Sequence, residues 1–89
     1  MVVTEGKRTF DLLRLMILIS LKEKPLTINQ ISRKTGINWR TVDNHITYLL
    51  GSCLLKQVMF CDYVKIVEIT PAGLAHIESN LEHWKEVLA

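Results

Sequence analysis

The spacing of apolar residues predicts a long helix over residues 8–24. Two apolar stripes run along this helix and leave a narrow third face, so the helix needs cover on two sides. The core of the domain can cover one side, and the other side is then a candidate interface. Pro25 ends the helix, because the residue before a proline is pushed out of the helical region. The first stripe holds Phe10, Leu13, Ile17 and Leu21, the second Leu12, Leu15, Met16 and Ile19, and the third face Asp11, Arg14, Leu18 and Lys22.

A capping sequence starts a second, shorter helix. Thr27, followed three residues later by Gln30, fits a capping box and predicts a helix over residues 28–34. Gly36 ends it, since glycine takes the positive φ of a tight turn at little cost.

A third helix follows directly. Asn38 is a good N-cap for a helix over residues 39–50. Two short helices joined by a turn that contains glycine form the helix-turn-helix unit, so we expect that unit over residues 28–50. The inward stripe of its second helix is Val42, Ile46 and Leu49.

After Gly51 the pattern changes from helical to extended. Residues 54–60 and 63–69 are rich in β-branched and aromatic side chains and are separated by only two residues. They predict a tight antiparallel hairpin over residues 54–69.

A last helix is predicted over residues 71–88. Thr70 and Pro71 supply favourable chemistry for the N-cap and for the first helical position. Apolar residues then recur at alternating steps of three and four, which is a heptad seam. The seam consists of Leu74, Ile77, Leu81, Trp84 and Leu88.

Length and composition favour one globular domain over residues 1–89, since 48% of these 89 residues are hydrophobic. The longest apolar stretch, residues 10–21, is too short to span a bilayer and contains Asp11 and Arg14. The N-terminal residues lack the features of a signal peptide. We therefore expect a cytoplasmic protein without a membrane partner.

The charge is unevenly distributed along the chain. Residues 1–40 hold eight Lys or Arg and three acidic residues, whereas residues 41–89 hold three Lys and six acidic residues. Such a division is expected when one end of a small domain faces a polyanion.

The order of the predicted elements is similar to that of the winged helix-turn-helix superfamily of transcriptional regulators. That superfamily includes the MarR, ArsR and PadR types, and the likeness is greatest to its small archaeal members. The segments that carry the resemblance are LTINQISRKTGINWRTVDNHITYLLGSCLLKQV and VEITPAGLAHI. The resemblance implies an α+β fold with a three-helix core, a two-stranded wing hairpin and an added C-terminal helix for dimerisation. It also implies binding to double-stranded DNA, with the second helix of the motif in the major groove.

The outward stripe of that second helix carries residue types that suit base edges. Arginine donates two hydrogen bonds to guanine, asparagine pairs with adenine and threonine contacts the thymine methyl group. We take Arg40 and Asn44 as the best candidates for base contacts and Thr47 as the next. The stripe is completed by Asp43, with Thr41 and Trp39 at its leading end, where Trp39 either packs or contacts DNA.

Candidate phosphate contacts lie on the preceding helix, and solvated surface is the alternative interpretation of each. Such contacts set register and affinity without reading sequence. The wing tip, residues 60–63, has no Lys or Arg, so wing contact with DNA is not expected. The phosphate candidates are Asn29, Arg33 and Lys34, together with Thr27 and Ser32.

No metal or catalytic site can be assembled from these residue types. His76 and His83 lie seven residues apart without a carboxylate or thiol at ligand spacing, and His45 fits a core or rim position. Cys53 and Cys61 are expected to be buried or half-buried thiols, too far apart to form a bridge if the segment between them is extended. The sequence therefore predicts no enzyme and no cofactor, and no small-molecule ligand is evident from it.

These patterns favour a homodimeric transcriptional regulator that binds specific double-stranded DNA. The alternatives are a winged-helix module for protein contact and an architectural, chromatin-type DNA binder. The dimer is expected because two apolar surfaces would be costly to leave in water. The predicted interface consists of Leu74, Ile77, Leu81, Trp84 and Leu88 of the last helix and Leu12, Met16 and Ile19 of the first.

Overall fold

The computed structural model describes the backbone of residues 5–61 and 64–88 and the side chains of residues 10–58 and 64–81. It confirms the predicted α+β architecture. Among the helices described, none combines the length and apolar character needed to cross a membrane. The elements are α1 (Glu5–Ser20), β1 (Leu26–Thr27), α2 (Ile28–Thr35), α3 (Trp39–Gly51), β2 (Leu55–Cys61), β3 (Val64–Ile69) and α4 (Pro71–Leu88).

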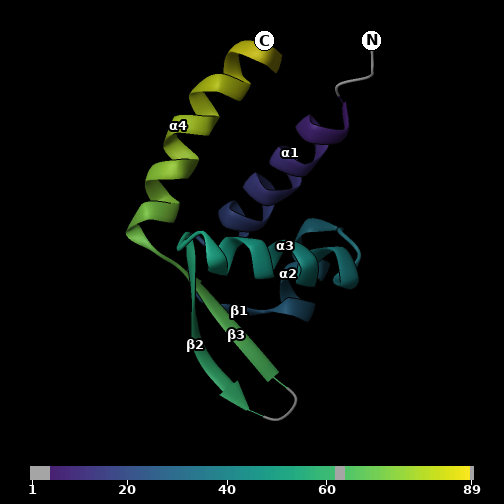
Figure 1. Cartoon of the computed structure of the whole chain (residues 1–89), viewed down its shortest axis with the longest axis vertical. Coiled ribbons are helices and arrows are strands. Elements are labelled where there is room, and N and C mark those ends of the chain that lie inside the picture. The colour runs from purple at the N-terminus through teal and green to yellow at the C-terminus, as the bar shows by residue number, and fades with distance from the viewer. Residues whose placement is uncertain (1–4, 62–63, 89) are drawn as a thin grey trace.

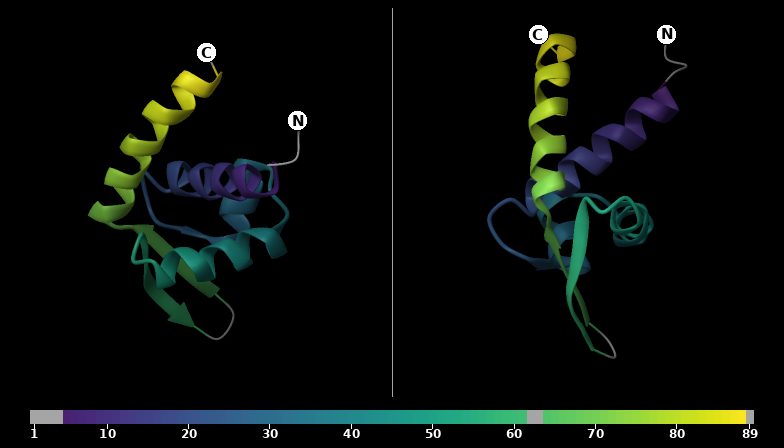
Figure 2. Two further views of the ribbon diagram at one scale, coloured as in Figure 1. Left: turned by 45° about the horizontal axis from the view of Figure 1, so that its top comes forward. Right: turned by 60° about the vertical axis from the view of Figure 1, so that its left-hand side comes forward.

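The long helices and the hairpin lie at opposite ends of the molecule (Figure 1). Helices α1 and α4 both extend away from the hairpin strands β2 and β3, while α2 and α3 lie between these two long helices and the far end of the strands. The right-hand view of Figure 2 shows the same separation from another side. The fold thus separates the helix-turn-helix from the free ends of α1 and α4.

Every element contributes to one apolar core, and α1 supplies more of it than its sequence pattern indicated. Leu18, assigned to the third face of this helix, is 0% exposed, whereas Phe10 is 52% exposed. That assignment was wrong because α1 packs against both the helix-turn-helix and α4. The predicted inward stripe of α3 is confirmed. The buried core consists of Leu15, Ile17, Leu18, Leu21, Leu26, Ile31, Ile37, Val42, Ile46, Leu49, Leu55, Val67 and Ile77.

Helix α1 ends at Ser20, four residues before the predicted end. The Ser20 hydroxyl donates to the carbonyl of Ile17 at 2.6 Å. The backbone N–H of Leu21 donates to the carbonyl of Leu18 at 3.0 Å, a tighter turn than an α-helix makes. The early end lets Leu21 enter the core, where it is buried.

Local capping sets the limits of α2 as predicted. The Thr27 hydroxyl accepts from the N–H of Gln30 at 3.1 Å, and the Gln30 side chain accepts from the N–H of Thr27 at 2.9 Å. Gly36 follows the helix with φ of +79°, the left-handed conformation that glycine adopts without steric cost. The capping box and the glycine stop are both confirmed.

Helix α3 begins at its predicted cap and ends in an unexpected way. Asn38 Oδ1 accepts from the N–H of Arg40 at 2.9 Å. Gly51 lies within the helix, and Cys53 takes the left-handed position after it, with φ of +63°. The N–H of Leu54 donates to Leu49 and that of Cys53 to Leu50, the two bonds of a Schellman motif. Cys53 is exposed, so its expected burial was wrong.

The sheet has a third strand that the sequence pattern did not predict. Strand β3 lies in the centre of an antiparallel sheet with the order β1-β3-β2. Leu26 of β1 pairs with Val67 of β3, and both side chains are buried. A register shift between Gln57 and Met59 interrupts the pairing of β2 with β3. The short β1 thus ties the start of α2 to the hairpin.

The start of α4 is fixed against the end of α3. Thr70 Oγ1 accepts from the N–H of Gly73 at 3.0 Å, as expected of an N-cap, and donates to the carbonyl of Cys53 at 2.8 Å. A side chain at Gly73 would collide with the Leu54 carbonyl and with Ile69. The close approach of this helical turn to the sheet therefore requires glycine.

Candidate nucleic-acid interface

Helix α3 presents a row of polar side chains on its outer face. Arg40, Asn44 and Thr47 are all exposed, and their spacing of four and three residues places them along one side of the helix. Trp39 is 52% exposed at the start of this row, and the Arg40 guanidinium carbon lies 5.5 Å from its ring centroid. The Thr47 hydroxyl donates to the carbonyl of Asp43 at 3.1 Å. The row can therefore offer a guanidinium, an amide and a methyl group to a partner.

Asp43 and Thr41, also predicted on this face, are half-buried. Asp43 Oδ1 lies 3.9 Å from Lys65 Nζ of β3, so an ion pair links α3 to the hairpin. This pair offsets the negative charge that α3 would otherwise present beside Arg40. The predicted wing tip, residues 60–63, lies outside the side chains that the structure describes.

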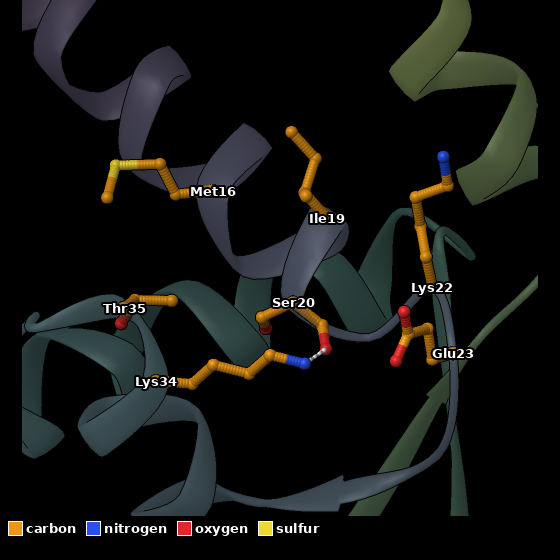
Figure 3. A pocket seen from close by; sticks show the side chains of 7 residues that line it. All are labelled: Met16, Ile19, Ser20, Lys22, Glu23, Lys34 and Thr35. Atoms are coloured by element: carbon orange, nitrogen blue, oxygen red, sulfur yellow. Dashed lines mark hydrogen bonds between the residues drawn. The ribbon is translucent and has the colours of Figure 1, made fainter.

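Of the predicted phosphate contacts, Asn29, Arg33 and Lys34 are exposed, whereas Thr27 and Ser32 are half-buried. The Thr27 hydroxyl caps α2, and the Ser32 hydroxyl donates to the carbonyl of Ile37 at 2.6 Å. Lys34 Nζ donates to the carbonyl of Ser20 at 3.2 Å, so its ammonium group lies at the end of α1, where helix carbonyls attract cations. Figure 3 shows Lys34 reaching across a pocket of about 490 Å³ between α1 and α2.

Behind the polar row, α3 contacts α1 through a buried histidine. His45 is 7% exposed, and its Nδ1 accepts a hydrogen bond from Arg14 Nε at 3.1 Å. The Arg14 guanidinium carbon lies 3.7 Å from the ring centroid of Tyr48, and the ring of Phe10 lies edge-on to His45 at 5.5 Å. Burial lowers the pKa of His45 from its ordinary value of 6.5, and the Arg14 charge lowers it further.

The predicted core or rim position of His45 is correct, but no local pattern links Arg14 to it. The two residues are 31 positions apart, so no local spacing connects them. A basic residue between two leucines, Leu13 and Leu15, was the available signal.

Apolar side chains remain exposed on α1 and α4. Leu12 and Ile19 of α1 are exposed, as are Leu74 and Leu81 of α4. Met16 is half-buried. Ile77 is 1% exposed and packs in the core of its own chain, so it is withdrawn from the predicted interface. The side chains of Trp84 and Leu88 lie outside the described residues.

Within the described part of the chain, no three His, Cys, Asp or Glu side chains lie close enough to share a metal ion. A comparison with curated protein sequences finds no significant match.

Several solved structures share the fold. BpsR of Bordetella bronchiseptica, whose DNA binding is regulated by 6-hydroxynicotinic acid, is 21% identical with a TM-score of 0.77, over 85% of this chain and 56% of that one. The transcriptional regulator BldR of Sulfolobus solfataricus is 19% identical with a TM-score of 0.77, over 85% and 56%. The transcriptional regulator Cth-833 of Clostridium thermocellum is 19% identical with a TM-score of 0.76, over 98% and 91%.

These identities establish the likeness of the fold alone. The chain spans little more than half the length of the first two regulators. Because BpsR responds to a small molecule, the expectation that this chain has no small-molecule ligand gains no support from the comparison.

The sequence itself matches one family. The model of the arsR family of bacterial regulatory proteins, a helix-turn-helix family, matches residues 11–57, which is more than half of the chain. That segment runs from α1 through the helix-turn-helix into β2. The family is one of regulators and not of enzymes, which agrees with the expectation from the sequence. The chain therefore belongs to the ArsR family of bacterial regulatory proteins.

Proposed function

We propose that this protein is a homodimeric transcriptional regulator that binds specific double-stranded DNA with α3 in the major groove. The observation that carries the proposal is the exposed row Arg40, Asn44 and Thr47 on a helix whose opposite face is buried. A helix held by a rigid core can present such a row to base edges with little loss of conformational entropy on binding.

Each side chain in the row has a distinct role in this proposal. Arg40 donates two hydrogen bonds to guanine, and Asn44 forms a bidentate pair with adenine. The Thr47 hydroxyl is turned to the helix backbone, so its methyl group is the part left to contact thymine. Asp43 faces Lys65 and acts by holding the hairpin against α3.

Affinity comes mainly from phosphate neutralisation by basic residues outside the row. Arg33 at the end of α2 is the leading phosphate contact, and Asn29 at its start can donate a hydrogen bond. Lys34 contributes if its ammonium group leaves the Ser20 carbonyl.

A twofold dimer through α1 and α4 completes the proposal. Leu12 and Ile19 on α1 and Leu74 and Leu81 on α4 are apolar, exposed and located on the helices that extend away from the hairpin (Figure 1). Burial of these side chains in a second copy removes them from water. Two copies of α3 then meet successive major grooves about 34 Å apart, which favours an inverted-repeat site.

A selection from random duplexes, followed by affinity measurements at about 50 and 200 mM salt, tests the proposal. DNA binding predicts enrichment of an inverted repeat and a steep loss of affinity at the higher salt, since phosphate contacts release counterions. Strong binding without an enriched sequence would favour an architectural DNA binder. Absence of any duplex binding would favour a protein-contact module and contradict the proposal.

A further inference from the structure

The contact between Arg14 and His45 has a geometry that depends on one proton. His45 Nδ1 can accept the hydrogen bond from Arg14 Nε only when that nitrogen carries no proton. Protonation would replace the acceptor with an N–H group and would place a second positive charge about one hydrogen-bond length from the guanidinium. The imidazole is buried, so water cannot readily screen that repulsion.

The same contact lies behind the exposed row of Arg40, Asn44 and Thr47 that is proposed to contact bases. His45 is adjacent in sequence to Asn44, and Tyr48, on which Arg14 stacks, is adjacent to Thr47. A change in how α3 packs on α1 at these two positions therefore moves the side chains that reach the bases. A set of binding side chains loses affinity for its ligand when the residues that hold it in place shift by about 1 Å.

We infer that Arg14 is a positioning residue for DNA binding. It holds α3 against α1 through neutral His45 and the Tyr48 ring. Protonation of His45 therefore releases α3 and weakens DNA binding. The inference rests on the proposed function, because the side chains that it positions are those proposed to read DNA. It adds a direction of regulation that the proposed function does not contain.

Other titratable groups of α1 and α4, which lie beside Arg14 and Tyr48, do not replace Arg14 as the partner of His45. Asp11 of α1 and His76 of α4 line a pocket of about 250 Å³ together with Arg14 and Tyr48. Among the described side chains, Arg14 is the one that donates to His45 and the one whose charge lowers its pKa.

The charged groups on the remaining neighbours of α3 are engaged elsewhere or exposed. Lys65 of β3 pairs with Asp43, and Lys56 of β2 lies 3.5 Å from Glu68. On α2, Lys34 donates to the Ser20 carbonyl and Arg33 is exposed. Arg14 is therefore the group through which the protonation of His45 acts on the packing of α3.

The direction of the effect distinguishes this contact from ordinary electrostatics. A histidine that gains a positive charge on a DNA-binding surface normally strengthens attraction to phosphate. Loss of the Arg14–His45 contact predicts the opposite, namely weaker binding as the pH falls. Burial and Arg14 both hold the pKa of His45 below 6.5, so the contact is intact at neutral pH and is lost in acid.

The test measures the affinity of the whole protein for its selected duplex between about pH 7.5 and pH 5, at constant salt. The wild type should lose about fivefold or more in affinity over this range. His45→Asn keeps an acceptor oxygen near the position of Nδ1 but cannot titrate there, so its affinity should be nearly independent of pH. The matched control His76→Asn removes an exposed histidine and should retain the wild-type profile.

Arg14→Lys keeps the positive charge and removes the Nε donor and the planar group that stacks on Tyr48. It should bind about fivefold or more weakly at pH 7.5, because the hydrogen bond and the stacking, and not the charge alone, hold α3 in place. The pH dependence of wild-type binding tests the inference even if a variant fails to fold. Affinity that is constant or rises in acid, or an Arg14→Lys protein that binds as tightly as the wild type at pH 7.5, would overturn this inference alone. Absence of DNA binding at pH 7.5 would overturn the proposed function and this inference with it.

Discussion

At the scale of single residues, two positions after helices adopt left-handed backbone conformations. Gly36 after α2 has φ of +79°, and Cys53 after α3 has φ of +63°. Glycine reaches this region without steric cost, whereas a residue with a Cβ atom is strained there. The sequence predicted the first position because a glycine occupies it. It missed the second because a nearby glycine, Gly51, suggested an earlier end to the helix.

Cys53→Gly should stabilise the protein. The substitution relieves a strain of about 1 kcal/mol, partly offset by the larger entropy of glycine in the unfolded chain, and we expect a net gain of about 0.5 kcal/mol. Urea unfolding measures it. Cys53→Ala is the matched control, since it removes the exposed thiol but keeps the Cβ atom, and it should leave stability almost unchanged. A Cys53→Gly protein less stable than Cys53→Ala would show that the left-handed turn is not strained.

At the scale of elements, features that adjacent residues encode were predicted correctly. The Thr27–Gln30 capping box, the Asn38 cap and the Thr70–Pro71 start each depend on residues within one helical turn. The starts of α2, α3 and α4 followed from them. The row of Arg40 and its neighbours on α3 followed from helical spacing in the same way.

Features that depend on contacts between distant segments were not accessible to the same reasoning. Leu18 is buried because α1 is packed on several sides, and α1 ends early so that Leu21 can enter the core. Strand β1 has two residues, too few for a periodic pattern, and exists because β3 lies beside it. The Arg14–His45 contact joins α1 to α3 across 31 positions. Local spacing therefore predicted which side chains α3 exposes, but not the contacts with α1 that hold α3 in place.

At the scale of the whole molecule, the proposed dimer would determine how many major grooves the protein can reach. The exposed leucines on α1 and α4 lie on the helices that extend from the helix-turn-helix, away from the hairpin (Figure 1). A dimer through these helices leaves both copies of α3 free. It also links two weak half-site contacts into one stronger interaction.

Leu12→Glu combined with Leu81→Glu should therefore give a folded monomer. Both side chains are exposed in one chain, so the fold should tolerate the charges, whereas an interface would bury them without partners. Sedimentation measures the oligomeric state. Ser79→Glu places a charge on the opposite side of α4 from Leu81 and should remain dimeric. A wild type that sediments as a monomer, or a double variant that remains dimeric, would contradict the proposed interface.

The central claim is that the outer row of α3 reads bases, and the most direct measurement compares single variants on two duplexes. Arg40→Ala and Asn44→Ala should each weaken binding to the selected duplex by about 1 to 3 kcal/mol, because each removes a bidentate base contact. Binding to random duplex should change much less. The matched controls Lys22→Ala and Asn80→Ala remove similar side chains outside α3 and should bind both duplexes as the wild type does. Equal losses on both duplexes, or no loss from either α3 variant, would contradict the claim that this helix reads sequence.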